Sequence, residues 1–310
     1  MDNKTDVVYL YYELKNAKLN RWAGGAAQPL MTQTVIKQIE LPHPDINVQR
    51  KASSVLSAYD DLITKNSRRV QIIEEMVQRI YREWFVDFRF PRHKKTKFVD
   101  SVMGKIPENW KLQNLGDLVE CCNEGTQAGE HLSGRKYVPI DCISRKSIAL
   151  TEARPWTEAQ SSLQLFQKGN ILFGAMRPYF HKVAIAPFDG VTRTTCFVLR
   201  PKDYQTFSYA LMTIFREETI AFATTSSQGA TIPYAVWNNS MEKMRVLVPT
   251  LNVIKEFEDC VSPLLKYIQG TYWRESNLKY ARDILIPKLI SGEIDVLGMD
   301  IAIQGQENGA

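Results

Sequence analysis

One local pattern occurs twice in this chain of 310 residues, at positions about 205 residues apart. The first copy, "GGAAQPLMTQTVIKQIELPHP", ends at Pro44, and the second, "QGATIPYAVWNNSMEKMRVLVPT", ends at Thr250. Each runs from Gly-Ala through Pro and a polar segment into an alternating apolar strand that closes on Pro, and a long helical pattern follows. Solenoid units recur every ~20–45 residues, so this spacing indicates a pseudo-twofold protein with a variable block between the copies.

The stretch after the first copy predicts one long helix over residues 46–90. Its interior holds neither Gly nor Pro, and apolar residues recur mostly three or four positions apart, at Ala52, Val55, Tyr59, Leu62, Val70, Ile73, Met76, Ile80 and Trp84. A helix of about 40 residues is about 60 Å long, which favours a coiled-coil seam over an ordinary globular helix. An amphipathic helix lying on its own domain is the alternative. Asn66 interrupts the stripe and is a candidate for fixing the register.

Residues 251–290 repeat this pattern and predict a second long helix. Pro263 and Gly270 weaken its regularity, so we expect a kink near one of them. The remaining residues, 291–310, predict a short extended piece and a frayed tail.

Residues 91–250, between the two helices, predict a β-rich domain. Short strand-like runs such as "KGNILFGAMRP", "KVAIAPFDG" and "VTRTTCFVLRP" are separated by turn residues. One helical segment, "TFSYALMTIFREETIAFAT", comes late in this block, and "VVYLYYELKNAKL" near the N-terminus resembles it. Residues 1–45 are therefore predicted to be the C-terminal remnant of a second such domain, and the predicted fold class is α+β.

Composition narrows the class of protein only moderately. The formal net charge of +5 permits a nucleic-acid partner without requiring one. The five cysteines include no C-x-x-C pair, which disfavours a disulfide framework or a zinc site. No apolar run approaches the ~20 residues of a transmembrane helix, and the N-terminus has no basic segment of the kind that opens a signal peptide. We therefore expect a cytoplasmic protein without membrane attachment.

The sequence shows no motif of a common enzyme site. It contains no G-x-x-x-x-G-K-[ST] phosphate loop, no G-x-G-x-x-G dinucleotide motif and no G-x-S-x-G nucleophile elbow. The four histidines are scattered without metal-ligand spacing. The carboxylate pairs Asp60–Asp61 and Glu74–Glu75 fall within the first long helix, and we interpret both as solvated faces. These patterns predict a protein that is not an enzyme and that holds no metal.

The order of the motifs resembles a known family. "YREWFVDFRFP" (81–91) ends the first long helix, "GKIPENWKLQNLGDL" (104–118) opens the β-rich block, and "RDILIPKLISGEI" (282–294) ends the second helix. The segments "GAAQP" and "GATIP" precede the two helices. Each motif is loose by itself, but in this order the chain resembles the DNA-specificity subunit of a type I restriction–modification enzyme over nearly its whole length.

This resemblance implies a non-catalytic subunit with two target recognition domains, each of which reads one half of a bipartite DNA target. It also implies two antiparallel spacer helices that set the distance between the half-sites. This chain departs from the plan because it holds one whole recognition domain, at 91–250, and therefore resembles a half-subunit or an N-terminally truncated form of such a subunit.

The partners that the resemblance implies are double-stranded DNA, methyltransferase subunits and a restriction–motor subunit. A second copy of this chain in a homodimer, or a complementing specificity subunit, would supply the other recognition domain. No cofactor is implied for this chain, since S-adenosylmethionine belongs to the methyltransferase subunit, and ATP and Mg to the restriction subunit.

Three polar loops of the recognition domain are candidates for DNA contact because they combine phosphate-binding with base-reading side chains. Residues 123–137 offer Thr126, Gln127, Arg135 and Lys136. Residues 174–182 offer Arg177, Tyr179, His181 and Lys182, with aromatic and basic residues interleaved. Residues 224–233 offer Ser226, Ser227, Gln228 and Thr231, beside a Gly that lets the backbone approach a phosphate. The alternative for each loop is a polar surface turn.

Three aromatic residues, Trp84, Phe85 and Phe88, widen the apolar row at the end of the first helix beyond what one seam needs. Packing against the adjacent domain is one interpretation, and we favour it. The resemblance implies a second, a docking surface for the methyltransferase subunit. The rival to the whole hypothesis is a homodimeric coiled-coil scaffold whose β-rich domain binds protein instead of DNA.

Overall fold

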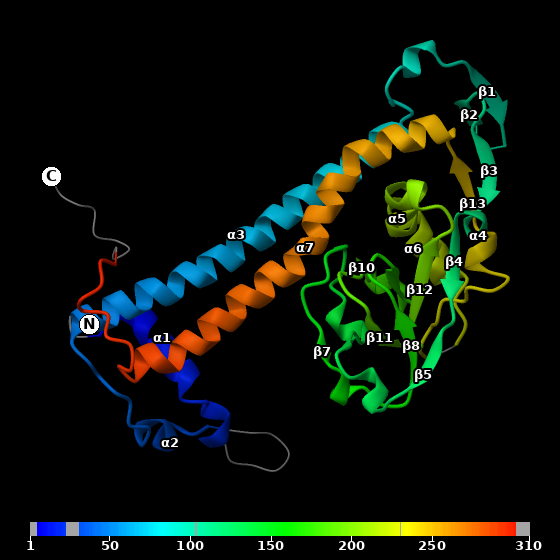
Figure 1. Cartoon of the computed structure of the whole chain (residues 1–310). Helices are drawn as coiled ribbons and strands as arrows, with labels where there is room; N and C mark the ends of the chain where they lie inside the picture. The colour runs from blue at the N-terminus through cyan, green and yellow to red at the C-terminus, as the bar shows by residue number, and fades with distance from the viewer. Residues whose placement is uncertain (1–4, 23–30, 103, 230, 302–310) are drawn as a thin grey trace. The chain divides into compact units, whose positions relative to one another are not determined.

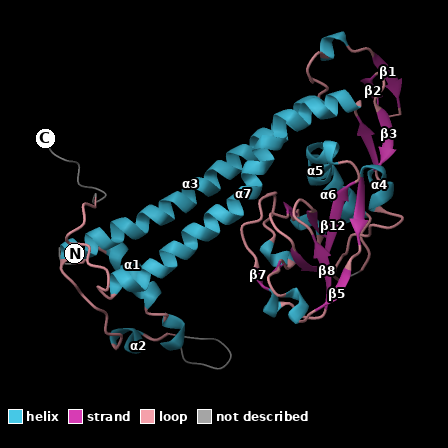
Figure 2. Ribbon diagram, viewed as in Figure 1, coloured by secondary structure: helices cyan, strands magenta, loops and turns pink. Residues whose placement is uncertain are grey.

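The computed structural model describes residues 5–22, 31–102, 104–229 and 231–301. It contains two compact units, one formed by residues 1–67 with 274–310 and the other by residues 68–273. Two helices of 40 residues each, α3 (Ile46–Phe85) and α7 (Leu251–Ile290), contribute to both units (Figure 1). Helices and a separate set of strands make up the rest, which confirms the predicted α+β class (Figure 2).

The two long helices differ slightly from their predicted forms. Helix α3 ends at Phe85, short of the predicted residue 90, and α7 has the predicted bounds. Helix α7 is continuous through Pro263 and Gly270, and the kink expected near one of them stays a prediction. No helix within the described ranges has both the length and the apolar character needed to cross a membrane.

In the first unit, the start of α3 and the end of α7 pack antiparallel, and helix α1 (Val7–Asn16) packs against both. Asp60 pairs with Arg282, while Ser67, further along α3, pairs with Glu275, earlier in α7. The short elements η1 (Leu19–Trp22) and α2 (Gln33–Lys37) follow α1. The buried cluster of this unit comprises Tyr9, Tyr12, Ala52, Leu56, Ile286, Leu289, Ile290 and Val296.

A polar contact crosses the seam one residue away from the predicted Asn66. The Ser67 hydroxyl donates to the Glu275 carboxylate at 2.9 Å, and Lys279 lies 3.5 Å from the same group. Glu275 is only 3% exposed, and a buried charge that loses its partners is strongly destabilising. Ser67 and Glu275 are therefore stronger candidates than Asn66 for holding the register of the pair.

In the second unit, the end of α3 and the start of α7 pack around an aromatic cluster with helix α5 (Phe207–Phe215). The Phe85 ring lies 4.8 Å from the ring of Phe257 and 4.9 Å from that of Tyr209. The Tyr81 hydroxyl shares a hydrogen bond of 2.9 Å with Thr213. Large aromatic rings contribute much of the buried apolar area of a core, so this cluster fastens the domain to both long helices.

Two sheets form the body of the second unit. The first has the order β10 (Val183–Ile185), β9 (Ile171–Gly174), β12 (Cys196–Pro201) and β4 (Val119–Cys122), and it is antiparallel throughout. The second has the order β5 (Gly125–Gln127), β8 (Ser162–Phe166), β11 (Gly190–Arg193), β6 (Lys136–Tyr137) and β7 (Arg154–Pro155), in which only the β11–β6 pair is parallel.

Two antiparallel pairs complete the strands of this unit. Strands β1 (Phe98–Ser101) and β2 (Gly104–Pro107) form one, and β3 (Lys111–Asn114) with β13 (Arg245–Val248) form the other. The second pair joins segments from the two ends of the recognition domain. Helices α4 (Leu115–Leu118) and α6 (Glu217–Thr225) accompany α5.

Helix α5 and strand β9 are buried because their sequences are apolar on every side. Strand β9 reads ILFG and is buried at all four positions, as a strand covered on both faces should be. Helix α5 reads FSYALMTIF, and eight of its nine residues are buried. A helix that is hydrophobic all round must be covered on all sides, and here the long helices and the four-stranded sheet share one buried cluster with it.

The first copy of the repeat does not form the strand predicted for it. Residues 24–30 lie outside the described residues, and within residues 31–45 the structure has helix α2 and no strand. The second copy ends in β13, which forms because β3 supplies its hydrogen-bonding partner. A strand requires a neighbour for its backbone groups, and the described chain pairs no strand with residues 39–42.

Glu74 is not on a solvated face, contrary to the interpretation of the Glu74–Glu75 pair. Its carboxylate is 5% exposed and accepts hydrogen bonds from the Ser147 hydroxyl at 2.7 Å and from the backbone amides of Ile148 and Ala149. Three donors satisfy a carboxylate well in a buried setting. Glu74 therefore ties α3 to the recognition domain. Asp60 is likewise engaged, by Arg282 and the Tyr12 hydroxyl.

Candidate nucleic-acid interface

The loop that connects β9 to β10 has an unusual backbone. Arg177 and His181 both adopt left-handed conformations, with φ of 52° and 51°, on either side of η6 (Pro178–Phe180). A left-handed non-Gly residue costs about 1–3 kcal/mol, persists only where its surroundings enforce it, and is common at functional sites. The contacts that enforce it here come from beneath the loop and from a second loop beside it.

Beneath the loop, His181 and Lys182 act as anchors. The His181 ring is buried, with Nε2 2.8 Å from the Phe215 carbonyl, and the Lys182 amine donates to the Ile140 carbonyl at 2.7 Å. Burial lowers the pKa of both side chains, which disfavours their charged forms. His181 therefore has no surface from which to touch DNA, which corrects the expectation for this residue, and Lys182 is occupied by a structural bond.

The second loop, after α6, lies directly alongside the first. The Arg177 amide donates to the Pro233 carbonyl at 2.8 Å, and the Ala235 amide to the Ala175 carbonyl at 2.9 Å. Gln228 and Tyr234 exchange two backbone hydrogen bonds, which closes the loop on itself. Gly229 is required in this turn, because its φ is 100° and a Cβ would meet the Ile232 carbonyl oxygen at 2.6 Å.

Together, these two loops present exposed aromatic and polar groups beside basic ones. Tyr179 and Tyr234 are exposed on the first and second loop, and Gln228 and Thr231 are also exposed. The Arg145 guanidinium lies 3.9 Å from the centre of the Phe180 ring, a cation–π contact that fixes a positive charge against the loop that carries Arg177. Cations hold phosphates, whereas arginine and amide groups can also read base edges.

Sequence reasoning missed Arg145 and Tyr234. Arg145 belongs to the basic pair Arg145–Lys146 in a turn outside all three candidate loops, and Tyr234 directly follows the loop of residues 224–233. The sequence shows that this pair is basic, but only the tertiary structure places the Arg145 guanidinium over the Phe180 ring. We call Arg145, Arg177, Tyr179, Gln228, Thr231 and Tyr234 the basic–aromatic patch.

Two residues of the second loop that were predicted to contact DNA form hydrogen bonds within the domain. The hydroxyls of Ser226 and Ser227 donate to the carbonyls of Phe222 and Ala223, each at 2.6 Å. These bonds add acceptor contacts at the end of α6, where the Phe222 carbonyl also accepts from the Ser226 amide. Their hydroxyl protons are therefore engaged within the domain.

The third candidate loop, residues 123–137, lies on the five-stranded sheet and not on the four-stranded one. Thr126 in the edge strand β5 is bonded to His131 at 2.9 Å, Gln127 is exposed and Arg135 is half-buried. The Lys136 ammonium lies 5.8 Å from the centre of the Tyr272 ring and 5.9 Å from that of Trp273, both on α7. Lys136 thus faces the long helix, and DNA contacts by Thr126, Gln127 and Arg135 stay predictions.

The aromatic residues at the end of α3 pack within the second unit. Phe85 is buried, Trp84 lies 5.6 Å from Phe257, and Phe88 lies 5.4 Å from Trp110, measured between ring centres. This arrangement favours packing against the adjacent domain over the docking surface that the resemblance implied. In the part of the chain that the structure describes, no cluster of three or more His, Cys, Asp or Glu side chains is placed to hold a metal ion.

Comparisons with known proteins agree on one family. The model described as "Type I restriction modification DNA specificity domain" matches residues 2–75 and 107–268. The type I restriction enzyme MjaIX specificity subunit of Methanocaldococcus jannaschii is 26% identical over 306 residues, which cover 93% of this chain and 69% of that protein. The HindI specificity subunit of Haemophilus influenzae is 18% identical over 327 residues, which cover 86% of this chain and 71% of that protein.

A solved structure shares the fold. The crystal structure of the type I restriction–modification S subunit from M. genitalium matches with a TM-score of 0.54 at 13% identity. The match covers 93% of this chain and 74% of that one.

Proposed function

We propose a function from one premise: the chain belongs to the family of type I restriction–modification DNA specificity domains and is a specificity subunit. In this proposal the recognition domain of the second unit binds double-stranded DNA and selects the sequence. The chain performs no chemistry itself. It directs methyltransferase subunits, and through them a restriction–motor subunit, to the selected DNA.

The observation that carries the DNA-binding part is the meeting of the two loops in the basic–aromatic patch. They are about 50 residues apart in sequence, yet backbone bonds join Arg177 to Pro233 and Ala235 to Ala175. A patch of exposed tyrosines, amide and hydroxyl groups with two arginines offers both phosphate binding and base reading. A rigidly held patch of this kind suits recognition, because little order must be imposed on binding.

The remaining parts of the proposal follow from the family. The two long helices would act as a spacer, since a rise of about 1.5 Å per residue fixes the separation of whatever they carry. A bipartite target would need a second recognition domain, supplied by a second copy of this chain or by a complementing chain. S-adenosylmethionine, ATP and Mg would bind to the methyltransferase and restriction partners, and this chain would need no cofactor.

A salt-dependent binding experiment tests the DNA-binding part. We expect the chain to bind random-sequence duplex DNA in fluorescence anisotropy, with an affinity that falls steeply as salt rises, because phosphate contacts release counterions. On random-sequence DNA, Arg177→Ala and Arg145→Ala should each reduce the salt slope by about 1, because phosphate contacts supply nearly all of non-specific binding.

Lys136→Ala is the matched control, because it removes an equal charge from the same domain at a position that faces α7. Its affinity for DNA should equal that of the unaltered chain. Binding that does not depend on salt, or no binding at all, would favour the rival function of a protein-binding scaffold.

A further inference from the structure

Glu74 places a carboxylate in the middle of an apolar face of α3. Val70 and Val77, one turn before it and one turn after it, are buried in the main cluster of the second unit. Residues three and four positions apart share one face of a helix, so packing alone would favour an apolar side chain at position 74. Burying a carboxylate costs free energy that an apolar residue would not cost. The reason for this residue therefore lies in the groups that it holds.

Glu74 holds a short segment of the recognition domain, residues 145–149, which we call the basic turn. One carboxylate oxygen, Oε1, accepts from the Ser147 hydroxyl at 2.7 Å and from the amides of Ile148 and Ala149 at 2.8 and 3.1 Å. Ile148 and Ala149 are only 2% and 3% exposed. Because three consecutive residues are bonded to the same oxygen, the end of the basic turn is fixed on α3.

The start of the basic turn carries Arg145, whose guanidinium lies 3.9 Å from the centre of the Phe180 ring in the basic–aromatic patch. The next residue, Lys146, has a left-handed backbone with φ of 54°. The two residues that flank η6 share this conformation, which persists only where the surroundings enforce it. A constrained backbone thus connects Arg145 to the residues that Glu74 holds.

The basic turn is also bonded to the patch loop of residues 174–182 and to the strand that follows it. The Lys146 amide donates to the His181 carbonyl at 2.8 Å. The Ile185 amide, in β10, donates to the Ile148 carbonyl at 2.9 Å. The basic turn therefore lies between α3 on one side and the first loop of the basic–aromatic patch on the other.

We propose that Glu74 is a positioning residue for DNA binding. By fixing the basic turn, it holds the Arg145 guanidinium over Phe180, and from there the guanidinium binds a phosphate of the DNA. The first long helix thereby takes part in DNA binding through a residue that does not touch the DNA. This role rests on the proposed function, because it requires that the basic–aromatic patch binds DNA.

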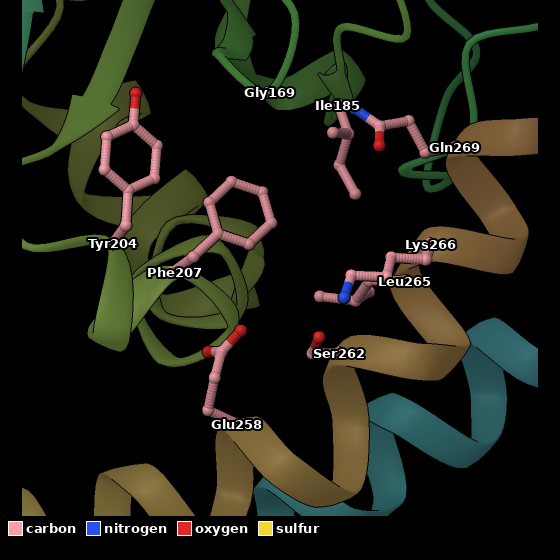
Figure 3. A pocket seen from close by; sticks show the side chains of 9 residues that line it. All are labelled: Gly169, Ile185, Tyr204, Phe207, Glu258, Ser262, Leu265, Lys266 and Gln269. Carbon is pink, nitrogen blue, oxygen red and sulfur yellow. The ribbon is translucent and has the colours of Figure 1, made fainter.

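The second long helix also holds the domain through a carboxylate, but at a different place. Glu258 of α7 accepts from the Ser208 amide at 2.8 Å, near the start of α5. Figure 3 shows Glu258 beside Phe207 at a pocket between α7 and the domain, and no residue that lines this pocket belongs to the basic–aromatic patch. Glu258 is therefore a matched control, since it holds α5 and not the basic turn.

The test measures how binding to random-sequence duplex DNA depends on salt. Glu74→Ala should weaken binding and reduce the salt slope by about 1, as Arg145→Ala does, because the released turn no longer holds that guanidinium on a phosphate. Removal of a negative charge would by itself strengthen the attraction to DNA. The expected loss therefore has the opposite sign to the direct effect of charge.

Three further variants separate positioning from a role in stability alone. Glu74→Gln keeps an oxygen that accepts hydrogen bonds and should restore the slope of the unaltered chain. Glu74→Ala should have no additional effect on the slope when Arg145 is already alanine, because the group that it positions is absent. Glu258→Ala removes a bond between a long helix and the domain and should leave the slope unchanged.

Limited digestion with trypsin reports on the basic turn without DNA. Trypsin cleaves after Arg145 and Lys146, and Glu74→Ala should be cut there about tenfold faster than the unaltered chain or Glu258→Ala, because local opening exposes the turn. If Glu74→Ala does not fold, Ser147→Ala takes its place. It removes one of the three donors and should cause smaller changes of the same sign in cleavage and in salt slope.

A slope and an affinity of Glu74→Ala equal to those of the unaltered chain would overturn the positioning role and leave the proposed function intact. A loss that persists in full when Arg145 is already alanine would also overturn it, since Glu74 would then act through another group. Unchanged cleavage of the basic turn would do the same. If the unaltered chain binds no DNA, the proposed function fails and the positioning role fails with it.

Discussion

Helices α1 and α5 show what a pair of long helices can and cannot specify by itself. Each is seated through a buried tyrosine and through an N-terminal amide that donates to a side chain near the start of a long helix. Among the described residues, only α5 shares a buried cluster with strands of a sheet, and only in that unit does the repeat end in a strand. Packing on the long helices is therefore sufficient to fix a helix, whereas a strand additionally needs the body of its domain.

The largest expected effect is a difference in the free energy of unfolding lost by alanine substitution at Tyr209 and at Tyr9. Tyr209→Ala should lower the free energy of unfolding of the second unit by about 3–5 kcal/mol, because it leaves a cavity in a helix packed on every side. Tyr9→Ala should cost about 2 kcal/mol in the first unit, because the opposite face of α1 is already solvated. Urea unfolding followed by hydrogen exchange would assign each loss to its unit.

Tyr-to-Phe substitutions sharpen the same comparison. The Tyr209 hydroxyl donates to the Leu247 carbonyl at 2.6 Å, while the Tyr9 hydroxyl is 3.5 Å from the Ile290 carbonyl. Tyr209→Phe should therefore cost about 1 kcal/mol, and Tyr9→Phe very little. Equal losses at the two sites would show that the two hydroxyl bonds contribute equally to stability and would contradict this difference.

The next effect concerns the tie between α3 and the recognition domain. Glu74→Ala should destabilise the second unit by about 2–3 kcal/mol, because it leaves the buried amides of Ile148 and Ala149 without acceptors. Glu75→Ala, on the exposed side of the same turn, is the matched control and should stay within about 0.5 kcal/mol. A similar result for both variants would restore the interpretation of the pair as a solvated face.

The smallest effect is a difference in pH dependence between the two units. Burial raises the pKa of Glu74 above its ordinary 4.5, so its contribution to stability falls as the pH rises above that value. Burial alone would also raise the pKa of Asp60, but the Tyr12 hydroxyl and Arg282 lower it below its ordinary 3.8. The contribution of Asp60 is therefore complete above pH 3.8 and is lost as the pH falls below it.

Amide variants would reveal these opposite slopes. Relative to the unaltered chain, Glu74→Gln should remove a fall in stability above pH 4.5. Asp60→Asn should remove a loss below pH 3.8. Urea midpoints measured from about pH 3 to about pH 7, a range that spans both ordinary values, provide the check, and slopes of the same sign for both variants would contradict the assignment.

The sequence predicted the features that depend on local periodicity. The apolar stripes from Ala52 to Trp84 and from Ile254 to Leu289 predicted both long helices. The likeness of "VVYLYYELKNAKL" to the late helical segment also agrees with the structure, because α1 and α5 pack on the long helices in a similar way. The sequence could not show whether residues 39–42 form a strand, because strand formation there depends on a partner strand elsewhere in the fold. Glu74 was misjudged because periodicity alone does not reveal donors from a distant turn.

The candidate interface was predictable only in outline. Polar composition identified the loops at 174–182 and 224–233, and their contact depends on tertiary pairing of Arg177 with Pro233. His181 was chosen as a basic residue among aromatics, but the left-handed turn directs its ring into the core. Arg145 enters the patch only through its contact with Phe180.

The central claim is that this chain selects a DNA sequence and leaves the chemistry to its partners. The most direct measurement combines the chain with type I methyltransferase subunits and S-adenosylmethionine on a random duplex library, followed by sequencing of the methylated positions. Methylation should require both components and fall at one defined sequence that Arg177→Ala weakens. Methylation by this chain alone, or the same sequence preference from the methyltransferase subunits without it, would contradict the claim.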